Sequence, residues 1–494
     1  MATELYRAEK LFIGGEWVAP SDGEITTSIN PSTGKPWASV AMAGAKDVDL
    51  AVAAAKDAMN GPWRRMAPMQ RANILRALAR IYAEHAPRLA ELESSDNGQP
   101  LRDTRAALPS HPQWYNYYAG LAEHLEGRHV QIDPNAHIYT TREPAGVVGA
   151  IIPWNAPLTT TTWKLATALA AGCAIVIKAA EHTPVTALEL ARLAEEAGVP
   201  PGVVNVVPGY GSVAGARLVA HPDVRVVSFT GEHRTAQDIM RNAADSMKRL
   251  AFECGGKSPH IIFDDADLEQ ALNAATHSAF VSCGQVCTLG SRILVQRSIY
   301  DRVVDEIARR ASAIRIGNAL DTATQMGPQT HQEQMEKTLR YFAIGREEGA
   351  RVVAGGEAYH SPETEGGYFV RPTVFADANN DMRSSREEIF GPVCSLIPFD
   401  TEEDAVRIAN DTIYGLVGGL WTRDVGRAHR VSAQIEAGTV WVNTYRYVRW
   451  AMPYGGYKMS GIGRENGPES LDEFTELKTT VVNLGNVYPD AYAR

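Results

Sequence analysis

The feature that most constrains the fold is a series of short apolar runs that begins near Gly146. The runs AGVVGAII, CAIVIKAA, GVVNVVPG and VRVVSFTG alternate with stretches of helical periodicity, such as TPVTALELARLAEEAG. Short, continuously apolar strands separated by helices are typical of parallel strands buried on both faces of a sheet. The pattern predicts an α/β doubly wound arrangement, which binds nucleotides at the carboxyl ends of its strands.

The same alternation resumes near Gly255 and indicates a second α/β domain. The runs SPHIIF, SRILVQ and TVWVN alternate there with helical stretches such as DLEQALNAATHSAF and SIYDRVVDEIARRASAI. Amphipathic helical patterns open the chain, and the run TELKTTVVNL near its end is strand-like. Such a strand either completes a sheet or pairs with another subunit. With 494 residues, the chain is expected to form two or three domains.

Charge and hydropathy argue against several kinds of partner. The formal net charge is −10, whereas binding to nucleic acid phosphates needs a clustered positive field. The N-terminal segment MATELYRAEKLFIGGEW lacks the apolar region of a secretory signal. The apolar run LATALAAGCAIVI is shorter than the roughly 20 residues of a membrane helix, so it predicts a buried helix that runs into a buried strand. We therefore expect a cytoplasmic protein that binds neither nucleic acid nor membranes.

The cysteines are few, at positions 173, 254, 283, 287 and 394. An odd, sparse set in a chain without a signal peptide does not indicate a disulfide framework. Cys283 and Cys287 have C-x₃-C spacing with no second pair of zinc-ligand spacing, and no H-E-x-x-H motif occurs. We expect no metal site. The segment SCGQVC could still hold a redox pair, or one nucleophile with an idle neighbour.

Two glycine-containing segments bear on nucleotide binding. PGYGSVAG, with Gly209, Gly211 and Gly215, approaches a dinucleotide loop but has the wrong spacing, so a plain turn is the commoner explanation. VVSFTG ends at Gly231 and is followed directly by a helix-like stretch. A strand that delivers a glycine to a helix N-terminus creates a natural pyrophosphate site.

Four segments taken together carry a family resemblance: IIPWNAP, AFECGGKSP, SCGQVC and EEIFGPV. In this order and at this spacing the chain resembles the NAD(P)-dependent aldehyde dehydrogenase superfamily. The segments IKAAEHTP, VNVVPGYG, FTG, PYGGYKMSGIGRE and TELKT extend the likeness over practically the whole chain. The resemblance implies a Rossmann-like cofactor domain, an α/β catalytic domain and a small oligomerisation sheet.

The resemblance also assigns the catalytic chemistry. Cys287 matches the family's nucleophile, which adds to an aldehyde carbonyl to form a thiohemiacetal and, after hydride transfer, a thioester. Asn155 matches the donor to the oxyanion, together with the backbone N–H of Cys287. Glu253 matches the general base that activates water for thioester hydrolysis. Cys283 matches no functional position, and a buried cysteine without a chemical role is expected there.

The resemblance implies NAD as the cofactor, with NADP possible but less favoured. Lys178 and Glu181 match the contacts to the adenosine ribose, where a carboxylate accepts hydrogen bonds from the hydroxyls but repels a 2′-phosphate. Glu388 and Phe390 match the residues at the nicotinamide ribose and ring. The further candidate cofactor contacts are Ile152, Trp154, Gly211, Phe229 and Gly231.

One departure concerns the pyrophosphate. Glu232 stands where many relatives have serine, and a carboxylate beside the pyrophosphate is repulsive unless it points away.

The candidate substrate channel is flat and apolar. We expect it to be lined by Ala156, Trp163, Val286, Thr288, Tyr447 and Trp450. Aromatic side chains of this kind favour a medium-sized apolar, unsaturated or aromatic aldehyde, although each can also serve core packing. Arg446 and Arg449 could instead hold a carboxylate and indicate a semialdehyde acid. Acyl transfer or ester hydrolysis at Cys287 without redox chemistry, and a catalytically silent binding paralogue, are further alternatives.

The resemblance implies a division into three parts. Residues 1–122 and 145–254 are expected to form the cofactor domain and residues 255–465 the catalytic domain. Residues 123–144 and 470–494 are expected to bridge subunits in a homodimer or homotetramer.

Overall fold

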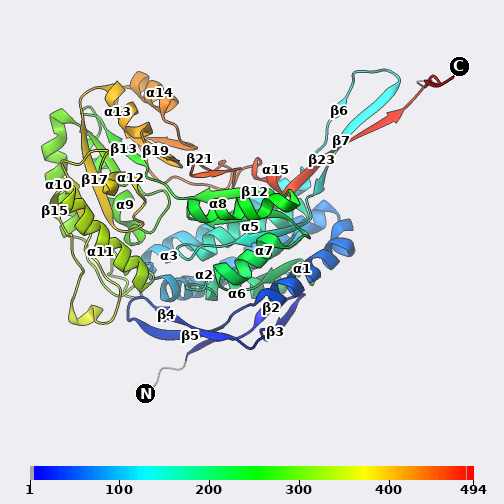
Figure 1. Ribbon diagram of the computed structural model, residues 1–494, viewed down its shortest axis with the longest axis horizontal. Coiled ribbons are helices and arrows are strands. Elements are labelled where there is room, and N and C mark those ends of the chain that lie inside the picture. Colours follow the sequence, from blue (N-terminus) through cyan, green and yellow to red (C-terminus); the bar gives the residue numbers. More distant parts are fainter. Residues whose placement is uncertain (1–4, 486, 494) are drawn as a thin grey trace.

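The computed structural model describes residues 5–485 and 487–493. Figure 1 shows two large α/β parts side by side, one around β12 (Arg249–Cys254) and one around β13 (Pro259–Ile262) and β17 (Val393–Phe399). A long arm made of β6, β7 and β23 projects from the first part, on the side away from the second. The α/β arrangement expected from the alternating runs is therefore confirmed.

The first sheet has eight strands, and the five in its middle run parallel. Four of these strands correspond to the four apolar runs quoted above, and the fifth ends at Cys254. In spatial order the strands are β22 (Gly461–Ile462), β12 (Arg249–Cys254), β11 (Val224–Gly231), β8 (Val147–Ile151), β9 (Ala174–Lys178), β10 (Val204–Val206), β2 (Leu11–Ile13) and β3 (Glu16–Val18).

The strand order creates a switch point beside β8. The chain passes from β8 to β9 and β10 on one side, and then returns to β11 and β12 on the other. In such sheets a crevice forms outside the carboxyl ends where the order reverses, and ligands bind there. The register pairs Phe229 with Ile151, and Thr230 with Glu253, so these strand ends lie side by side.

Helices cover both faces of this sheet. One face packs against α1 (Ala45–Asn60), α7 (Ala216–Ala220) and α8 (His233–Ala243). On the other face lie α5 (Pro157–Ala171) and α6 (Val185–Glu196) with an outer layer, whose helices are α2 (Pro68–Asn97), α3 (Leu101–Ala107), α4 (Pro112–Glu123) and α15 (Ser470–Phe474). The run LATALAAGCAIVI is the buried end of α5 joined to β9, as predicted, and Gly172 turns the chain between them at φ 82°.

The second sheet is parallel except for one edge strand. In spatial order its strands are β15 (Arg351–Ala354), β16 (Thr373–Ala376), β17 (Val393–Phe399), β14 (Arg292–Gln296), β13 (Pro259–Ile262), β19 (Val417–Trp421) and β20 (Thr439–Val442).

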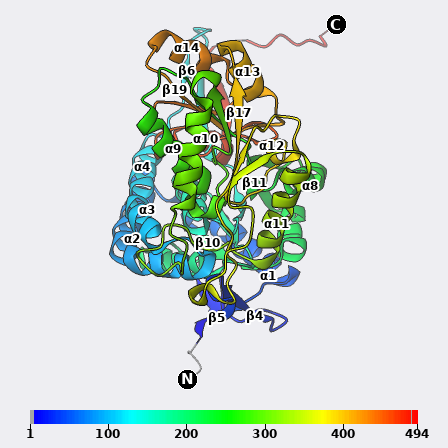
Figure 2. The same cartoon turned by 90° about the vertical axis from the view of Figure 1, so that its left-hand side faces the viewer.

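Separate apolar clusters fill its two faces. One cluster includes residues of α9 (Leu268–Phe280) and α10 (Tyr300–Ser312), and the other includes residues of α13 (Glu402–Asn410) and α14 (Val425–Gln434). Figure 2 shows these four helices around β17 and β19 of this sheet. The remaining helices of this part are α11 (Gln332–Glu347) and α12 (Arg383–Arg386).

Three small sheets complete the fold. The C-terminal run TELKTTVVNL forms β23 (Thr475–Asn483), which pairs antiparallel with β7 (Ala136–Pro144), and β7 pairs with β6 (His129–Val130). Near the N-terminus, β1 (Tyr6–Ala8), β5 (Lys35–Ala41) and β4 (Ile25–Asn30) form the second small sheet. The third has two strands, β18 (Tyr414–Gly415) and β21 (Tyr457–Lys458). The exact domain boundaries stay a prediction.

Within the part of the chain that the structure describes, no helix has the length and apolar character needed to cross a bilayer.

A buried arginine ties the second sheet to the segment that follows β12. Arg292 on β14 is fully buried, and its guanidinium donates to the carbonyls of Lys257, Ile408 and Ala409 at 2.7–2.8 Å. Because a buried carbonyl without a donor destabilises the native state, this side chain holds two backbone segments in place, at Lys257 and at the end of α13. One of them, at Lys257, lies next to the candidate site described below.

We expect Arg292→Met to lower the free energy of unfolding by about 3 kcal/mol, since it removes the donor to the Lys257 and Ala409 carbonyls, whereas the Ile408 carbonyl keeps a hydrogen bond from Asn380. Chemical denaturation measures this change. Arg297→Met is the matched control, because Arg297 pairs with Asp400 on the surface, where an ion pair contributes about 0–1 kcal/mol. Equal losses in the two variants would contradict the assigned role of Arg292.

Candidate active site

A cavity of about 430 Å³ opens where the carboxyl ends of the first sheet face the second α/β part. It is lined by segments far apart in the sequence, and most of the predicted site residues meet there. The predicted residues that line it are Trp154, Asn155, Ala156, Trp163, Gly231, Glu253, Val286, Cys287, Thr288, Glu388 and Phe390.

Cys287 lies on a loop with an unusual backbone. Ser282, Cys283 and Gly284 follow one another in the left-handed region, with φ of 50°, 53° and 72°. This region is unfavourable for residues other than glycine, so the surrounding structure must hold the loop. Gln329 does so by donating to the carbonyl of Cys283 at 2.7 Å. The loop turns Cys287 into the cavity, where it is partly exposed.

The two neighbouring cysteines differ in their surroundings. Cys283 is 1% exposed and packs in the apolar core of the second part, whereas Cys287 lines the cavity. All five cysteines are free thiols. Only one thiol of the SCGQVC segment is thus accessible to a molecule in the cavity.

Asn155 follows β8, and hydrogen bonds hold both its backbone carbonyl and its side-chain amide. Its carbonyl accepts hydrogen bonds from Asn97 and Gln99, at 3.1 and 2.7 Å. Its side-chain amide donates to the carbonyl of Gln285 at 2.9 Å, two residues before Cys287. The Asn155 amide therefore lies beside the cysteine loop.

Glu253, the second-last residue of β12, is 5% exposed, and its Oε2 is buried without a hydrogen-bond partner among the described residues. Burial and the charge of Glu465 raise the pKa of Glu253 well above its usual value, while Lys164 and Arg464 act in the opposite direction. Glu465 itself forms a buried ion pair with Lys164. A carboxyl group with a raised pKa and a free oxygen can take up a proton from water.

Burial dominates the titration of the Cys287 thiol and raises its pKa to about 11. The hydrogen bond of Tyr454 and the positive charge of Arg446 lower the pKa, whereas Glu253 and Glu388 raise it. The Tyr454 hydroxyl lies 3.4 Å from Cys287 Sγ. Sequence reasoning missed this contact, since nothing in the PYGG segment indicates which side chain its tyrosine touches.

The Glu388 carboxylate occupies space that is free because residue 255 is a glycine. A Cβ at position 255 would overlap the Glu388 carboxylate, and the N–H of Gly256 donates to that carboxylate at 3.1 Å. Burial raises the pKa of Glu388 to about 7. Phe390 has φ 59° and packs edge-on against Trp154, with ring centroids 5.3 Å apart. Both side chains line the cavity.

The other predicted cofactor contacts lie outside the cavity lining. Lys178 ends β9 and pairs with Glu181 at 3.1 Å, in the crevice beyond the sheet. Ile152 and Phe229 are buried, and the Phe229 ring occupies the space that a Cβ at Gly231 would need. Gly211 begins a short π-helical turn on the surface.

Glu232 is the N-cap residue of α8, and its side chain is 55% exposed. Its carboxylate lies 3.9 Å from the guanidinium of Arg234. The residue still borders the cavity, so its charge faces both solvent and the crevice.

The substrate residues divide into two groups. Ala156, Trp163, Val286 and Thr288 line the cavity, whereas Tyr447 is 49% exposed and lies outside its lining. Trp450 also lies outside, and packs edge-on against Trp114. Val448 and Tyr454, which also line the cavity, belong to the same loop as Tyr447 and Trp450, TYRYVRWAMPY, which the sequence predicts for the substrate channel. Sequence reasoning missed His111 and Trp114, because they come from another segment.

Arg446, by contrast, lines the cavity. Its backbone lies in the left-handed region at φ 58°, and its guanidinium forms neither a hydrogen bond nor an ion pair with any described residue. Arg449 is exposed and lies over the ring of Tyr447.

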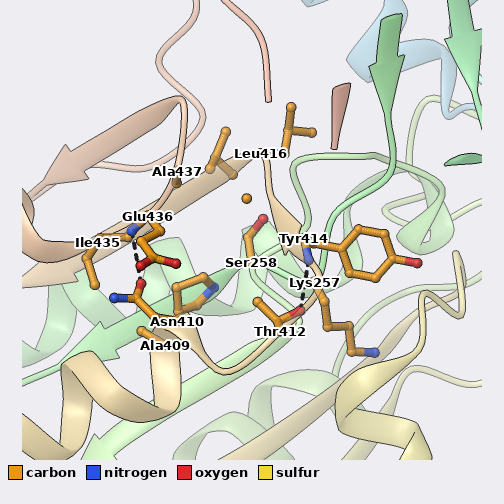
Figure 3. A pocket seen from close by; sticks show the side chains of 13 residues that line it. Lys257, Ser258, Ala409, Asn410, Thr412, Tyr414, Leu416, Ile435, Glu436 and Ala437 are labelled. Carbon is orange, nitrogen blue, oxygen red and sulfur yellow. Dashed lines mark hydrogen bonds between the residues drawn. The ribbon is translucent and has the colours of Figure 1, made fainter. Parts of the chain in front are cut away.

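Behind the site lies a much smaller cavity of about 10 Å³, which has room for a single water molecule. Figure 3 shows its lining, with Ser258 and Thr412 at the centre and Lys257 beside Tyr414. Its size excludes a substrate. Within residues 5–485 and 487–493, no cluster of three or more His, Cys, Asp or Glu side chains could hold a metal ion.

Comparisons with known proteins identify the family. The model of the aldehyde dehydrogenase family matches residues 17–480. DhaS of Bacillus subtilis, provisionally named an aldehyde dehydrogenase, is 44% identical over 486 residues, which are 98% of this chain and 97% of DhaS.

Two solved structures have nearly the same fold. A betaine aldehyde dehydrogenase from Staphylococcus aureus, in complex with NAD+, has a TM-score of 0.97 at 38% identity and covers 99% of this chain and 97% of its own. An NAD+ complex of an aldehyde dehydrogenase from Bacillus cereus has a TM-score of 0.95 at 44% identity, covering 97% of each chain.

We expect iodoacetamide to alkylate Cys287 about tenfold faster than any other cysteine of the folded protein, because access and thiolate fraction control this reaction. Peptide mass spectrometry after timed quenching measures the five rates. Cys254 is the informative comparison, since it borders the same cavity but is 3% exposed. Equal labelling of Cys283 and Cys287 would show that the loop does not present one thiol selectively.

Proposed function

We propose, on the premise that the chain belongs to the aldehyde dehydrogenase family, that it oxidises an aldehyde to the carboxylic acid through a covalent intermediate on Cys287. The cofactor is NAD. The observation that carries the proposal is the meeting of Cys287, Asn155, Glu253 and Glu388 around one cavity. These four groups supply a nucleophile, an oxyanion donor, a base and a cofactor contact.

In the first step the Cys287 thiolate attacks the aldehyde carbon. A sulfur–carbon bond forms, and the carbonyl π pair moves to oxygen. The Asn155 amide and the backbone N–H of Cys287 donate to this oxyanion, which supports attack because the donors are already held in place. Collapse of the oxyanion expels a hydride and leaves a thioester on Cys287.

The cavity and its surroundings fit a dinucleotide. Thr230 Oγ1 lines the cavity and is buried without a partner among the described residues, so a polar group is needed there. Glu388 and Phe390 would hold the nicotinamide end, and Lys178 with Glu181 the adenosine ribose. When bound, NAD supplies the hydride acceptor. Glu181 favours NAD over NADP because its carboxylate would repel a 2′-phosphate.

Glu253 completes the cycle. Its free, buried oxygen takes a proton from water, and the hydroxide equivalent attacks the thioester carbon. The carbon–sulfur bond breaks, the acid leaves, and Cys287 is regenerated as a thiolate. Family branches that transfer the acyl group to coenzyme A generally lack this base, so we favour hydrolysis.

We expect Glu253→Gln to give a burst of NADH close to one per active site and then a slow steady state, since only thioester hydrolysis loses its base. Cys287→Ala should give no burst, whereas Cys283→Ala should keep wild-type kinetics. Stopped-flow absorbance at 340 nm measures all three. A catalytically silent paralogue would give no NADH even in the wild type.

The aromatic walls support a medium-sized apolar, unsaturated or aromatic aldehyde. Trp114 and Trp163 stack with ring centroids 6.1 Å apart, and Trp163 packs edge-on against Tyr454, close to Cys287. Ala156 leaves space at the start of α5. Flat apolar surfaces of this kind favour substrates whose non-reacting end is itself flat and apolar.

A second candidate substrate is a semialdehyde acid. It is favoured by the unpaired guanidinium of Arg446 on the cavity wall, which could bind a carboxylate. Arg449 is the weaker candidate because it is exposed and lies over Tyr447.

An aldehyde panel with both nicotinamide cofactors distinguishes the two substrates. We expect the highest kcat/KM for benzaldehyde-like or terpenoid-like aldehydes with NAD, and a smaller loss in Arg446→Met that is the same for all of these aldehydes, because the charge of Arg446 also favours the Cys287 thiolate. If a carboxylated aldehyde is preferred, Arg446→Met should lower its kcat/KM about tenfold or more, and Arg449→Met should not. A clear advantage of NADP would overturn the assignment of Glu181.

We further propose that the protein works as a homodimer or homotetramer. The arm of β6, β7 and β23 carries exposed apolar side chains, including Leu477, Val481 and Val482, which support burial against another subunit. Analytical ultracentrifugation distinguishes these states from a monomer. The cytoplasmic location stays a sequence-based expectation.

A further inference from the structure

Tyr454 contacts the nucleophile, and the chemical steps proposed above give it no part. Tyr454 is 4% exposed, and its hydroxyl lies 3.4 Å from Cys287 Sγ, within hydrogen-bonding distance for sulfur. Among the residues that the structure describes, the Cys287 sulfur is the only partner of this hydroxyl. The residues are 167 positions apart, so their contact is a property of the folded site alone.

The fold holds this tyrosine rigidly. Its backbone N–H and carbonyl both pair with Glu465, with N···O distances of 2.6 Å. Its ring packs edge-on against Trp163 at 5.3 Å between centroids. A hydroxyl fixed in this way needs no reorganisation before it donates, which makes its hydrogen bond more effective.

The electrostatic setting of Cys287 makes such a donor important. Burial and the nearby carboxyl groups of Glu253 and Glu388 all disfavour a thiolate. Two groups favour the thiolate, namely the Tyr454 hydroxyl and the charge of Arg446. The phenol is a donor rather than a base in this setting, since burial raises the pKa of Tyr454 well above its usual value.

We propose that Tyr454 is a further catalytic residue, whose hydroxyl donates a hydrogen bond to the Cys287 thiolate and increases the fraction of nucleophile available for attack. This inference deepens the proposed function and rests on it for the role of Cys287. The thiol proton leaves to water, and Tyr454 keeps its own proton throughout. When the sulfur–carbon bond forms, negative charge moves from sulfur to the carbonyl oxygen.

The size of the effect follows from two opposing changes. Removing a hydrogen bond to a charged group should raise the pKa of Cys287 by about one unit, which lowers the thiolate fraction about tenfold. A more basic thiolate is also a stronger nucleophile, by about threefold per unit. The net loss of rate below the pKa is therefore about threefold.

The test uses Tyr454→Phe, which removes one oxygen and keeps the ring. The readout is the rate of Cys287 alkylation by iodoacetamide in the absence of substrate, followed by peptide mass spectrometry over a series of pH values. We expect about threefold slower alkylation at neutral pH and a pH profile displaced upward by about one unit.

Tyr445→Phe is the matched control. Tyr445 belongs to the same aromatic group, with its ring 4.9 Å from Trp441, and its buried hydroxyl has no partner among the described residues. Its loss should leave the alkylation profile unchanged. Thermal unfolding of both variants checks that the fold is intact.

The acid limb of kcat/KM against pH gives a second, independent reading in the active enzyme. It should move upward in Tyr454→Phe by the same amount as the alkylation profile. An unchanged alkylation profile, or equal shifts in the two tyrosine variants, would overturn the inference. Alkylation of Cys287 needs no turnover, so it tests the role of Tyr454 separately from the proposed function. If the protein oxidises no aldehyde, the proposed function is wrong, but the alkylation profiles still show whether Tyr454 acts on the thiol.

Discussion

The site depends on the parallel register of β8, β11 and β12. This register places the ends of three strands side by side, with Thr230 opposite Glu253 and Phe229 opposite Ile151. Asn155 then follows the first strand, Gly231 ends the second, and Glu253 lies within the third. A shift of one residue in the β11–β12 pair would turn Glu253 to the other face of the sheet, since side chains alternate along a strand. The second sheet only needs to bring Cys287 and Glu388 to this edge.

The cavity also sets the proton chemistry. Two carboxyl groups and a thiol share a space in which charged forms are poorly solvated, and the pKa values of Cys287, Glu253 and Glu388 are all raised. Each group therefore holds its proton more tightly than it would in water. The positive charges of Lys164, Arg464 and Arg446 partly offset this effect. Protons must be passed between such groups rather than released freely, which suits a cycle that alternates between thiolate attack and base-assisted hydrolysis.

The sequence predicted the fold well because the strands are continuously apolar and the helices are amphipathic. It also nominated Cys287, Asn155, Glu253 and Glu388, which meet around one cavity. The contacts between distant segments could not be predicted, because spacing along the chain carries no information on which side chains touch. The hydrogen bond of Tyr454 to Cys287 and the ion pair of Lys164 with Glu465 are of this kind. For the same reason Tyr447 and Trp450, expected in the substrate channel, lie outside the cavity lining. The domain boundaries and the residue roles stay predictions.

The central claim is that the aldehyde is oxidised to an acyl group bonded to one particular sulfur, and that this acyl group forms only when a nicotinamide can accept the hydride. The most direct measurement is acid quenching of the Glu253→Gln protein after mixing with an aldehyde and NAD, followed by peptide mass spectrometry. The account predicts the mass of the acyl group on the peptide that contains Cys287, and no such adduct when NAD is left out. An adduct on another residue, or the same acyl adduct without NAD, would contradict it.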